Sequence, residues 1–285
     1  MSIGDAEIKT QERVIRFFKD PEILGYQYIG NLSDYQNKNI KEDRLRQYLR
    51  LKGYADKLVD AAVMQLQQEA GNLSRGVYDA NKTVYSRLKY GIPVSESPEK
   101  PPVTVQLVDE EKPLNNDFAI AEEVTVVEQS EKRPDLVVYL NGIAVAVIEL
   151  KRSSISVSEG IRQNLTNQKN SFIQSFFTTM QFCMAGNESE GLRYGTLLTG
   201  EKFYMEWKDD GFKEHEEERD SVDVRISKTC EGIENKLLKQ IYAMFDKERF
   251  IDLIMNLLSL IKASKKYAGT ISILVSSVPS RGLLI

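Results

Sequence analysis

The stretch RPDLVVYLNGIAVAVIELK (residues 133–151) decides the fold and carries charges that need an explanation. Two apolar runs flank an Asn-Gly pair, a pattern that predicts a β-hairpin. Asp135 stands at the start of the first run, and Glu149 and Lys151 close the second. Charges on buried strands are costly unless they are paired or bind a metal. The hairpin therefore predicts a site that uses these charges.

The length of the loop at Asn141-Gly142 determines which face of the hairpin Asp135 occupies. A two-residue turn would put Asp135 and Glu149 on opposite faces, because side chains alternate along a strand. A three-residue loop would pair Tyr139 with Ile143 and place Asp135 diagonal to Glu149 on the same face. We predict the three-residue loop. One face of the second strand then carries Val145, Val147, Glu149 and Lys151.

Asp135 and Glu149 together supply the hard carboxylate oxygens that Mg²⁺ prefers. The backbone carbonyl of Leu150 lies between the two charged side chains of the second strand and is a third candidate ligand. Lys151 is placed to orient an attacking water or to stabilise charge that develops on a phosphate. This set predicts metal-assisted phosphodiester hydrolysis. The alternative is a hairpin at a sheet edge whose Glu149 and Lys151 are solvated.

Composition excludes several other classes of protein. The chain has 285 residues, 28% of them charged, with a net charge of -4, so nucleic acid would have to bind a local basic surface. The lone histidine, His215, lies in a charged run, which disfavours Ser-His-Asp and Cys-His catalysis and His-rich zinc sites. No GxxxxGK[ST] phosphate-binding loop is present. Two cysteines, no signal-peptide pattern and no membrane-length apolar run indicate a cytoplasmic protein.

The pattern along the chain predicts an α/β fold with helices at both ends and a mixed sheet between them. Residues 1–95 are predicted to form an N-terminal helical region that packs on the core, and 96–230 form the core itself. Residues 231–258 return to helix. The strands are expected at 103–108, 118–127, 135–140, 143–150, 180–185, 194–199 and 202–207, with a helix at 157–177 and a charged loop at 213–220.

The order of several motifs resembles one known family. Pro134-Asp135 followed by Glu149-Leu150-Lys151 is similar to the PD-(D/E)xK nuclease signature. Over roughly residues 35–258 the chain resembles the N-terminal part of the R subunit of type I restriction–modification enzymes. The stretches that carry this resemblance are YDANKTVYSRLKYGI (78–92), NNDF (115–118), KRPD (132–135) and LNGI (140–143).

The resemblance implies a restriction-endonuclease-like mixed sheet flanked by helices and Mg²⁺-dependent cleavage of double-stranded DNA. It also implies an ATP-driven translocase after the nuclease part, with the methylase and specificity subunits as partners. Gln163 fits the glutamine of the family's Q-x-x-x-Y motif, but Asn167 stands at the tyrosine position, and Gln168 is a poorer substitute. Glu42 fits an acidic residue on an early helix that approaches the metal. Its alternative is a solvated glutamate.

Arg152 and Arg162 are candidate phosphate contacts, with solvated arginines as the alternative. Asn167 puts in doubt the DNA contact or ordering role of the motif tyrosine. Three functions therefore stay open at this stage. They are the nuclease part of a type I R subunit, a non-catalytic DNA-binding or assembly fragment of the same complex, and a stand-alone nuclease of another repair system.

The tail 259–285 departs from the family, whose lead-in to the motor reads FDKGIKKVCRHNQYFGIK. Synonymous codons can be chosen for Ser259 to Ser276 that, read from the third base, encode FDKGIKKVCRHNQYFGI. We therefore expect a frameshift near residue 258 that removes the motor. A divergent C-terminal helix and strand is the alternative, and the coding DNA distinguishes the two.

Overall fold

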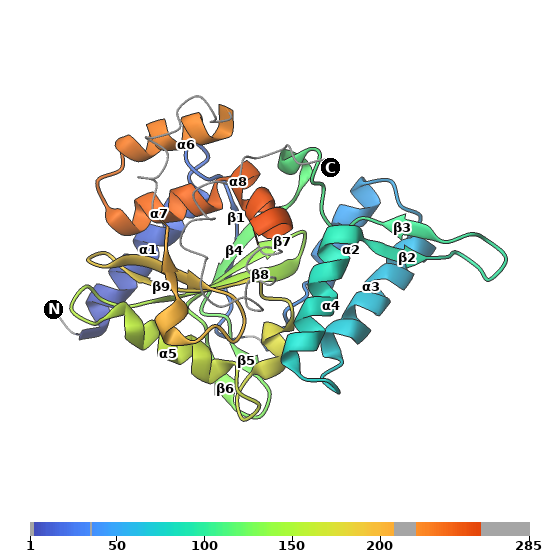
Figure 1. Cartoon of the computed structure of the whole chain (residues 1–285), viewed down its shortest axis with the longest axis horizontal. Coiled ribbons are helices and arrows are strands. Elements are labelled where there is room, and N and C mark those ends of the chain that lie inside the picture. Colours follow the sequence, from blue (N-terminus) through green and yellow to red (C-terminus); the bar gives the residue numbers. More distant parts are fainter. Residues whose placement is uncertain (1–2, 35, 208–220, 258–285) are drawn as a thin grey trace.

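A mixed seven-stranded sheet forms the centre of the computed structural model, which describes residues 3–34, 36–207 and 221–257 (Figure 1). Its order is β1-β4-β7-β8-β9-β10-β11. The pairs β1–β4 and β8–β9 are parallel and the others antiparallel, which confirms the expected α/β class. The strands are β1 (Gln27–Asn31), β4 (Phe118–Glu122), β7 (Leu136–Leu140), β8 (Ile143–Leu150), β9 (Phe182–Asn187), β10 (Gly191–Gly195) and β11 (Met205–Glu206).

Helices flank this sheet, and three of them form a separate group beside a small projecting hairpin (Figure 1). That group is α2 (Glu42–Leu51), α3 (Asp56–Gly71) and α4 (Val77–Tyr90), next to the pair β2 (Ile92–Val94) and β3 (Val103–Val105). Helix α5 contacts β8 and β9, whereas α1 contacts β1 and β8. The remaining helices are α1 (Ile3–Lys19), α5 (Val157–Asn167), α6 (Ser221–Glu231), α7 (Lys236–Phe245) and α8 (Lys247–Asp252).

The two faces of the sheet bury different apolar clusters because side chains alternate along each strand. Leu136 and Val138 of β7 belong to the larger cluster, which includes residues of α1, α2, α3, α4, α7 and α8. Val137 and Tyr139 belong to the second cluster, which includes Ile173, Phe176, Phe177 and Met180. Both strands of the central hairpin are therefore buried on both faces, and the solvated edge hairpin is excluded.

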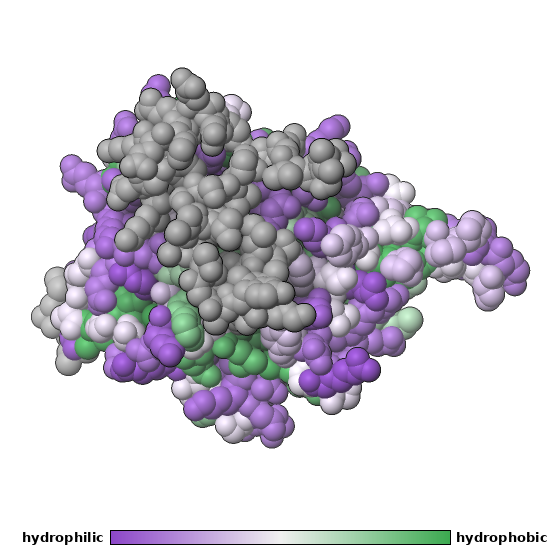
Figure 2. Space-filling model, viewed as in Figure 1, coloured by the Kyte–Doolittle hydropathy of each residue, from purple (hydrophilic) through white to green (hydrophobic). Residues whose placement is uncertain are grey.

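Hydrophilic side chains predominate over the visible surface of the described residues (Figure 2). The hydrophobic patches in that view are small and separate. Within the described ranges, every helix is too short or too polar to cross a bilayer.

The register of β7 and β8 differs from the predicted one. Leu140 pairs with Ile143, so the loop at Asn141-Gly142 has two residues and not three. The register then shifts, and Val138 pairs with Ala146, which leaves Val145 as the extra residue of a β-bulge. The Val145 carbonyl accepts a hydrogen bond from the Gln181 N–H at 2.7 Å. The loop-length prediction was wrong.

The bulge nevertheless restores the face that the site requires. Beyond it, Leu136 pairs with Ile148, so Asp135 and Glu149 at the next position lie opposite each other. Val145 is displaced from the face of Val147 and joins the larger cluster, contrary to the predicted grouping. The residue inserted at a bulge reverses, from that point on, which side chains of the strand face each side of the sheet. A two-residue turn followed by one bulge therefore places Asp135 on the same face as a three-residue loop would.

Helix α2 packs directly against the hairpin turn. Asn141 and Gly142 have φ values of +52° and +82°, as a primed turn requires. The Lys41 N–H donates to the Gly142 carbonyl at 2.7 Å. A Cβ on Gly142 would lie 2.7 Å from both the Leu45 nitrogen and the Lys41 carbonyl oxygen. Only glycine therefore fits between this turn and the helix.

Gly142→Ala is expected to destabilise the protein by about 3 kcal/mol, because a strained φ and a backbone overlap add together. Gly53→Ala is the matched control. Gly53 has a φ of +86° but open space around its Cα, so its substitution should cost only about 1 kcal/mol. Urea unfolding of both variants measures the difference. Equal losses would show that the packing against α2 contributes nothing.

Several predicted elements have different limits in the structure. The N-terminal region is not wholly helical, because Gln27–Asn31 forms the edge strand β1. The expected strand 118–127 breaks at Glu123, whose φ is +50°, into β4 and β5 (Val126–Val127). Strand β5 pairs with β6 (Glu131–Lys132) in a separate two-stranded sheet.

The C-terminal half shows similar differences. The expected helix 157–177 ends at Asn167, and a 3₁₀ turn, η2 (Gln174–Thr178), follows the polar Lys169-Asn170-Ser171 segment. The strand expected at 194–199 lies earlier, at Gly191–Gly195, and the one expected at 202–207 is reduced to Met205–Glu206, with the 3₁₀ turn η3 (Glu201–Phe203) between them. The helical region expected at 231–258 is divided, in its described part, into α7, α8 and a π-helical turn, Leu253–Leu257. The charged loop with His215 and the tail 259–285 lie outside the described residues.

Candidate active site

The strand pairing brings the two carboxyls of the motif together at one end of the hairpin. Asp135 immediately precedes β7, and its Oδ2 accepts the Leu150 N–H at 2.7 Å. Glu149 lies opposite on β8 and is fully buried. Burial raises the pKa of Asp135 to about 6, although the Leu150 hydrogen bond and the charge of Lys151 act in the opposite direction. A neutral or shared-proton state of the pair is therefore favoured when no cation is bound.

The two carboxyl oxygens of Glu149 differ in their hydrogen bonding. Gln163 Nε2 donates to Glu149 Oε2 at 2.7 Å. No N–H or hydroxyl group in the described part of the chain reaches Glu149 Oε1, although that atom is buried, and the group that interacts with the Glu149 carboxyl besides Gln163 is the Asp135 carboxyl. Burial raises the pKa of Glu149 well above its ordinary value, and the charge of Asp135 raises it further. A buried carboxylate oxygen without a donor is the kind of atom that a cation would satisfy.

Lys151 is positioned by both its backbone and its side chain. Its N–H donates to the Gly186 carbonyl at 2.9 Å, which continues the pairing of β8 with β9. Its Nζ lies 3.0 Å from Glu7 Oε1 and 3.1 Å from the Leu150 carbonyl oxygen. Burial lowers the pKa of Lys151, but the charges of Asp135 and Glu7 outweigh this effect and raise it overall. The side chain is therefore a fixed cation beside the carboxyl pair.

Helix α5 brings Gln163 to the carboxyls because it lies very close to the sheet. A Cβ on Gly160 would lie 2.9 Å from Ala185 Cβ and 3.5 Å from Glu149 Cβ. Gln163, three residues later, lies on the same face of the helix as Gly160. The helix begins where Ser156 Oγ accepts the Ser158 N–H. Gly160 was not singled out from the sequence, because its small size matters only once the strand beneath it is known.

A pocket of about 420 Å³ opens beside these groups. Four of the residues at its rim are basic and one is acidic. Its lining residues are Lys132, Arg133, Lys151, Glu159, Arg162, Gln163, Thr166 and Asn167. A polyanion is the ligand that this combination of cations and amides favours.

Asn167 lines this pocket, whereas Gln168 does not. Asn167 lies four residues after Gln163, on the same helix face, and lines the pocket with it. Gln168 is buried on the other side, where its Oε1 accepts the Leu198 N–H at 2.7 Å. Its Nε2 points at Cys183 Sγ, 3.5 Å away. Gln168 therefore cannot replace the tyrosine of the family motif in this pocket.

Glu42 is not brought to this site. Helix α2 begins against the hairpin turn, and Glu149 is the seventh residue after Gly142 along the strand, a distance of about 20 Å. The Glu42 carboxylate instead accepts hydrogen bonds from Arg46 at 2.8 Å and from Gln67 at 2.9 Å. The solvated-glutamate alternative describes it better than the metal-ligand one.

Of the two predicted phosphate contacts, Arg162 lines the pocket and Arg152 does not. Arg162 forms ion pairs with Glu159 at 2.8 Å and with Glu201 at 2.9 Å. Its guanidinium is therefore already engaged by two carboxylates. Arg152 follows Lys151 and is partly exposed.

Two acidic residues near the site were missed from the sequence. Glu7 on α1 contacts Lys151, and Glu123 at the end of β4 pairs with Arg133 at 2.8 Å. The charge of Glu123 contributes to the raised pKa of both Asp135 and Glu149. Neither residue belongs to a spacing motif, so only the tertiary structure reveals them.

The donor set fits Mg²⁺ better than a softer metal. Within the described ranges, no three His, Cys, Asp or Glu side chains cluster closely enough to hold a metal by themselves. Mg²⁺ commonly uses one or two carboxylates and retains several waters. Asp135, Glu149 and the Leu150 carbonyl match that requirement, and the unsatisfied Glu149 Oε1 supports it.

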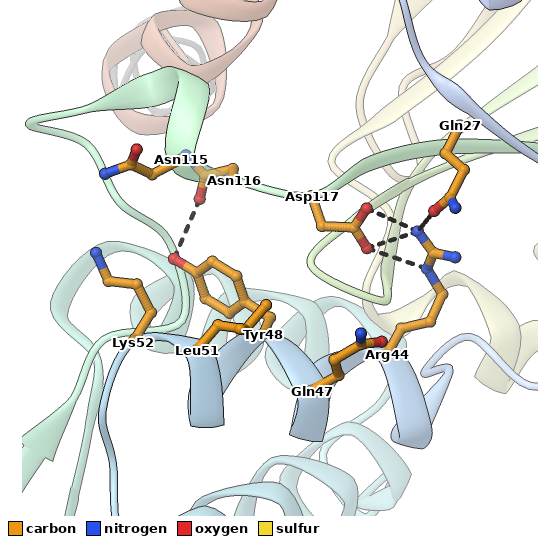
Figure 3. Close-up of a pocket in the computed structure, with 9 residues that line it drawn as sticks. All are labelled: Gln27, Arg44, Gln47, Tyr48, Leu51, Lys52, Asn115, Asn116 and Asp117. Atoms are coloured by element: carbon orange, nitrogen blue, oxygen red, sulfur yellow. Dashed lines mark hydrogen bonds and ion pairs between the residues drawn. The ribbon is translucent and has the colours of Figure 1, made fainter.

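A second pocket, of about 550 Å³, lies at the opposite end of the hairpin (Figure 3). Its polar side chains contact one another. Arg44 binds Asp117 through two nitrogens, and the Tyr48 hydroxyl donates to Asn116 Oδ1 at 3.3 Å. Asn116 Oδ1 also accepts from Asn141 Nδ2 at 2.8 Å. The NNDF segment therefore anchors the hairpin turn, and we assign it a structural role.

A mixed sheet flanked by helices, with Asp135 opposite Glu149 and Lys151 beside them, defines the restriction-endonuclease-like class of α/β proteins. The family model for the type I restriction enzyme R protein N terminus matches residues 7–203. The chain belongs to this family. None of the curated proteins compared with the chain matches it.

Proposed function

We propose that this chain is a Mg²⁺-dependent DNA endonuclease module that hydrolyses phosphodiester bonds. One observation carries the proposal most strongly. Asp135 and Glu149 face each other beside Lys151 and a basic-rimmed pocket, and one buried oxygen of Glu149 has no donor. A purely structural hairpin would have no reason to bury two facing carboxyls, one of which carries an oxygen without an N–H or hydroxyl donor.

Each residue has a distinct role in this proposal. Asp135, Glu149 and the Leu150 carbonyl would hold Mg²⁺, which would supply a Lewis acid for the phosphate. Gln163 keeps Glu149 oriented through its amide. Lys151 would hold the attacking water or stabilise the charge that develops on the phosphate. The pocket rim would position the DNA strand through its phosphates.

The family supports a wider set of partners. Membership of the type I R protein family implies that double-stranded DNA and the methylase and specificity subunits are partners of this chain. The R subunit resemblance further implies that ATP drives a translocase in such proteins. Within the described ranges, we assign no residue to ATP binding. We propose that cleavage by this chain alone is slow, because cleavage in such systems is coupled to translocation.

A second candidate function is a DNA-binding or assembly fragment with impaired catalysis. Asn167 favours it, because this residue stands in the pocket where the family motif has a tyrosine. Such a fragment would bind DNA at the same pocket without cleaving it. The two candidates therefore differ only in the chemical step.

Nicking of supercoiled plasmid in Mg²⁺ tests the proposal. The wild-type chain is expected to convert the plasmid to open circles, and Asp135→Ala should abolish the conversion. Nicking that persists in Asp135→Ala would exclude this site. DNA binding in Ca²⁺ without any nicking in Mg²⁺ would favour the second candidate.

Gln163→Ala is expected to lower the nicking rate about 10- to 100-fold, the usual effect of losing a group that orients a metal ligand. The variant removes the hydrogen bond to Glu149 Oε2 and leaves that carboxylate free to rotate. Thr166→Ala is the control, since Thr166 lines the same pocket and is not hydrogen-bonded to either carboxyl. Equal rates for the two variants would contradict an orienting role for Gln163.

A further inference from the structure

The cations around the active-site pocket differ in how fully they are engaged. The Arg162 guanidinium forms bonds to Glu159 and to both oxygens of Glu201. Lys151 is bonded to Glu7. The Lys132 ammonium lies 4.7 Å from the centre of the Phe172 ring. Three of the four basic side chains at the pocket therefore already have a defined partner.

Arg133 is engaged by one carboxylate only. Its Nε lies 2.8 Å from Glu123 Oε2, and its side chain is 55% exposed. Within the described residues Glu123 is its one ion-pair partner, and its two terminal nitrogens donate no hydrogen bond. Because the guanidinium is planar, an anchored Nε fixes the plane and the direction of the two terminal nitrogens. This is the arrangement that suits a bidentate contact with a phosphate.

Glu123 is held firmly enough to act as that anchor. Its φ of +50° is unusual for a residue with a side chain. In this conformation its N–H donates to the Asp135 carbonyl at 2.9 Å, so its backbone is tied to the catalytic strand. Its Oε1 accepts from the buried Gln11 amide at 3.0 Å. A strained residue fixed at both ends beside a catalytic group is a feature found at functional sites.

We propose that Arg133 contacts a backbone phosphate of the DNA substrate and that Glu123 is the positioning residue that directs its guanidinium toward the pocket. The inference rests on the proposed function, because it assumes that DNA occupies the pocket. It assigns the main phosphate contact to Arg133, in place of Arg152 and the already paired Arg162. The contact would fix the strand one residue away from the Pro134-Asp135 segment that begins the catalytic strand.

An electrostatic role for Glu123 makes the opposite prediction from a positioning role. If Glu123 only adds negative charge, then Glu123→Gln should strengthen DNA binding, because phosphates are repelled by carboxylates. If Glu123 positions Arg133, the same variant should weaken binding despite the more favourable charge. Glu122→Gln is a matched control. Glu122 is the adjacent residue, accepts from the same Gln11 amide and is not bonded to Arg133.

The test is fluorescence anisotropy of a labelled duplex with the full chain in Ca²⁺, as a function of NaCl concentration. Arg133→Ala is expected to weaken binding about 10-fold and to reduce the slope of log K against log salt by about 1. Glu123→Gln should weaken binding about 3-fold, whereas Glu122→Gln should leave it equal or slightly tighter. Thermal melting of each variant verifies that it is folded.

The inference is overturned if folded Arg133→Ala retains wild-type affinity and salt slope, or if Glu123→Gln binds as tightly as Glu122→Gln. The inference is also overturned if the wild-type chain does not bind the duplex. The proposed nuclease function fails by a different result, namely Mg²⁺ cleavage that is absent or unaffected by Asp135→Ala. Binding in Ca²⁺ and cleavage in Mg²⁺ therefore test the two ideas separately.

Discussion

Lys151→Ala is expected to lower Mg²⁺-dependent nicking by about 10²- to 10³-fold, the usual effect of removing one preorganised group that stabilises a developing charge. Lys151 Nζ is held 3.0 Å from Glu7 Oε1 and 3.1 Å from the Leu150 carbonyl oxygen, so its charge is fixed beside the carboxyl pair. Nicking assays with excess protein over plasmid measure the loss.

Lys202→Ala is the control for Lys151→Ala, because it removes the same charge at a residue that does not line the pocket. Its nicking rate should stay within about twofold of wild type. The Lys151→Ala chain should still bind a duplex in Ca²⁺ and melt cooperatively. A Lys151→Ala chain that is folded and nicks at the wild-type rate would remove Lys151 from the mechanism.

Glu149→Gln is expected to stabilise the metal-free protein by about 2 kcal/mol while it abolishes cleavage. The buried Glu149 carboxyl is costly to ionise, and its Oε1 has no donor. A glutamine keeps the oxygen that accepts from Gln163 and supplies an N–H that can face Asp135. For a chain of this size the melting temperature should rise by about 5 °C.

The control for Glu149→Gln is Glu128→Gln, at a partly buried carboxylate whose oxygens all have donors. Glu128 accepts bonds from the Ser175 N–H, the Ser175 hydroxyl and the Phe176 N–H. Its substitution should destabilise the protein, because an amide accepts fewer hydrogen bonds than a carboxylate. Destabilisation by Glu149→Gln as well would show that the Glu149 charge is compensated in the metal-free fold.

The stability of the metal-free protein should also depend on pH in a defined direction. Burial raises the pKa of Asp135 from 3.8 to about 6, so the folded state binds this proton more tightly than the unfolded chain. The contribution of Asp135 is therefore fully present below about pH 4, falls as the pH rises to about 6, and is level above that. The total change is on the order of 3 kcal/mol. Urea unfolding at a series of pH values should show this decrease, and Asp135→Asn should reduce it.

In the hairpin, the sequence predicts the two strands but not their register. Two continuous apolar runs around Asn141-Gly142 were enough to predict two adjacent buried strands, and β8 has the predicted limits, Ile143–Leu150. They could not reveal the bulge at Val145, because that residue is as apolar as its neighbours. The Val145 carbonyl at the bulge accepts a hydrogen bond from the Gln181 N–H, which comes from the segment before a different strand.

The site shows the same division. Asp135, Glu149 and Lys151 come together as the hairpin motif predicted, and Gln163 joins them as the family resemblance implied. Glu42 was misplaced because an acidic residue on an early helix is a weak signal when several helices have one. Glu7 and Glu123 were missed because their proximity to the site depends on the docking of α1 and on the break after β4.

The sequence by itself determined the class of fold, the hairpin and the identity of its charged residues, because strand periodicity and buried charge are local properties. Only the tertiary structure decided which face Asp135 occupies, which oxygen of Glu149 has no donor and which cation at the pocket rim keeps free donors. Those features depend on one bulge, on the close approach of α5 at Gly160 and on pairings between residues far apart in the chain. Local pattern cannot encode them, since each requires the position of a second element.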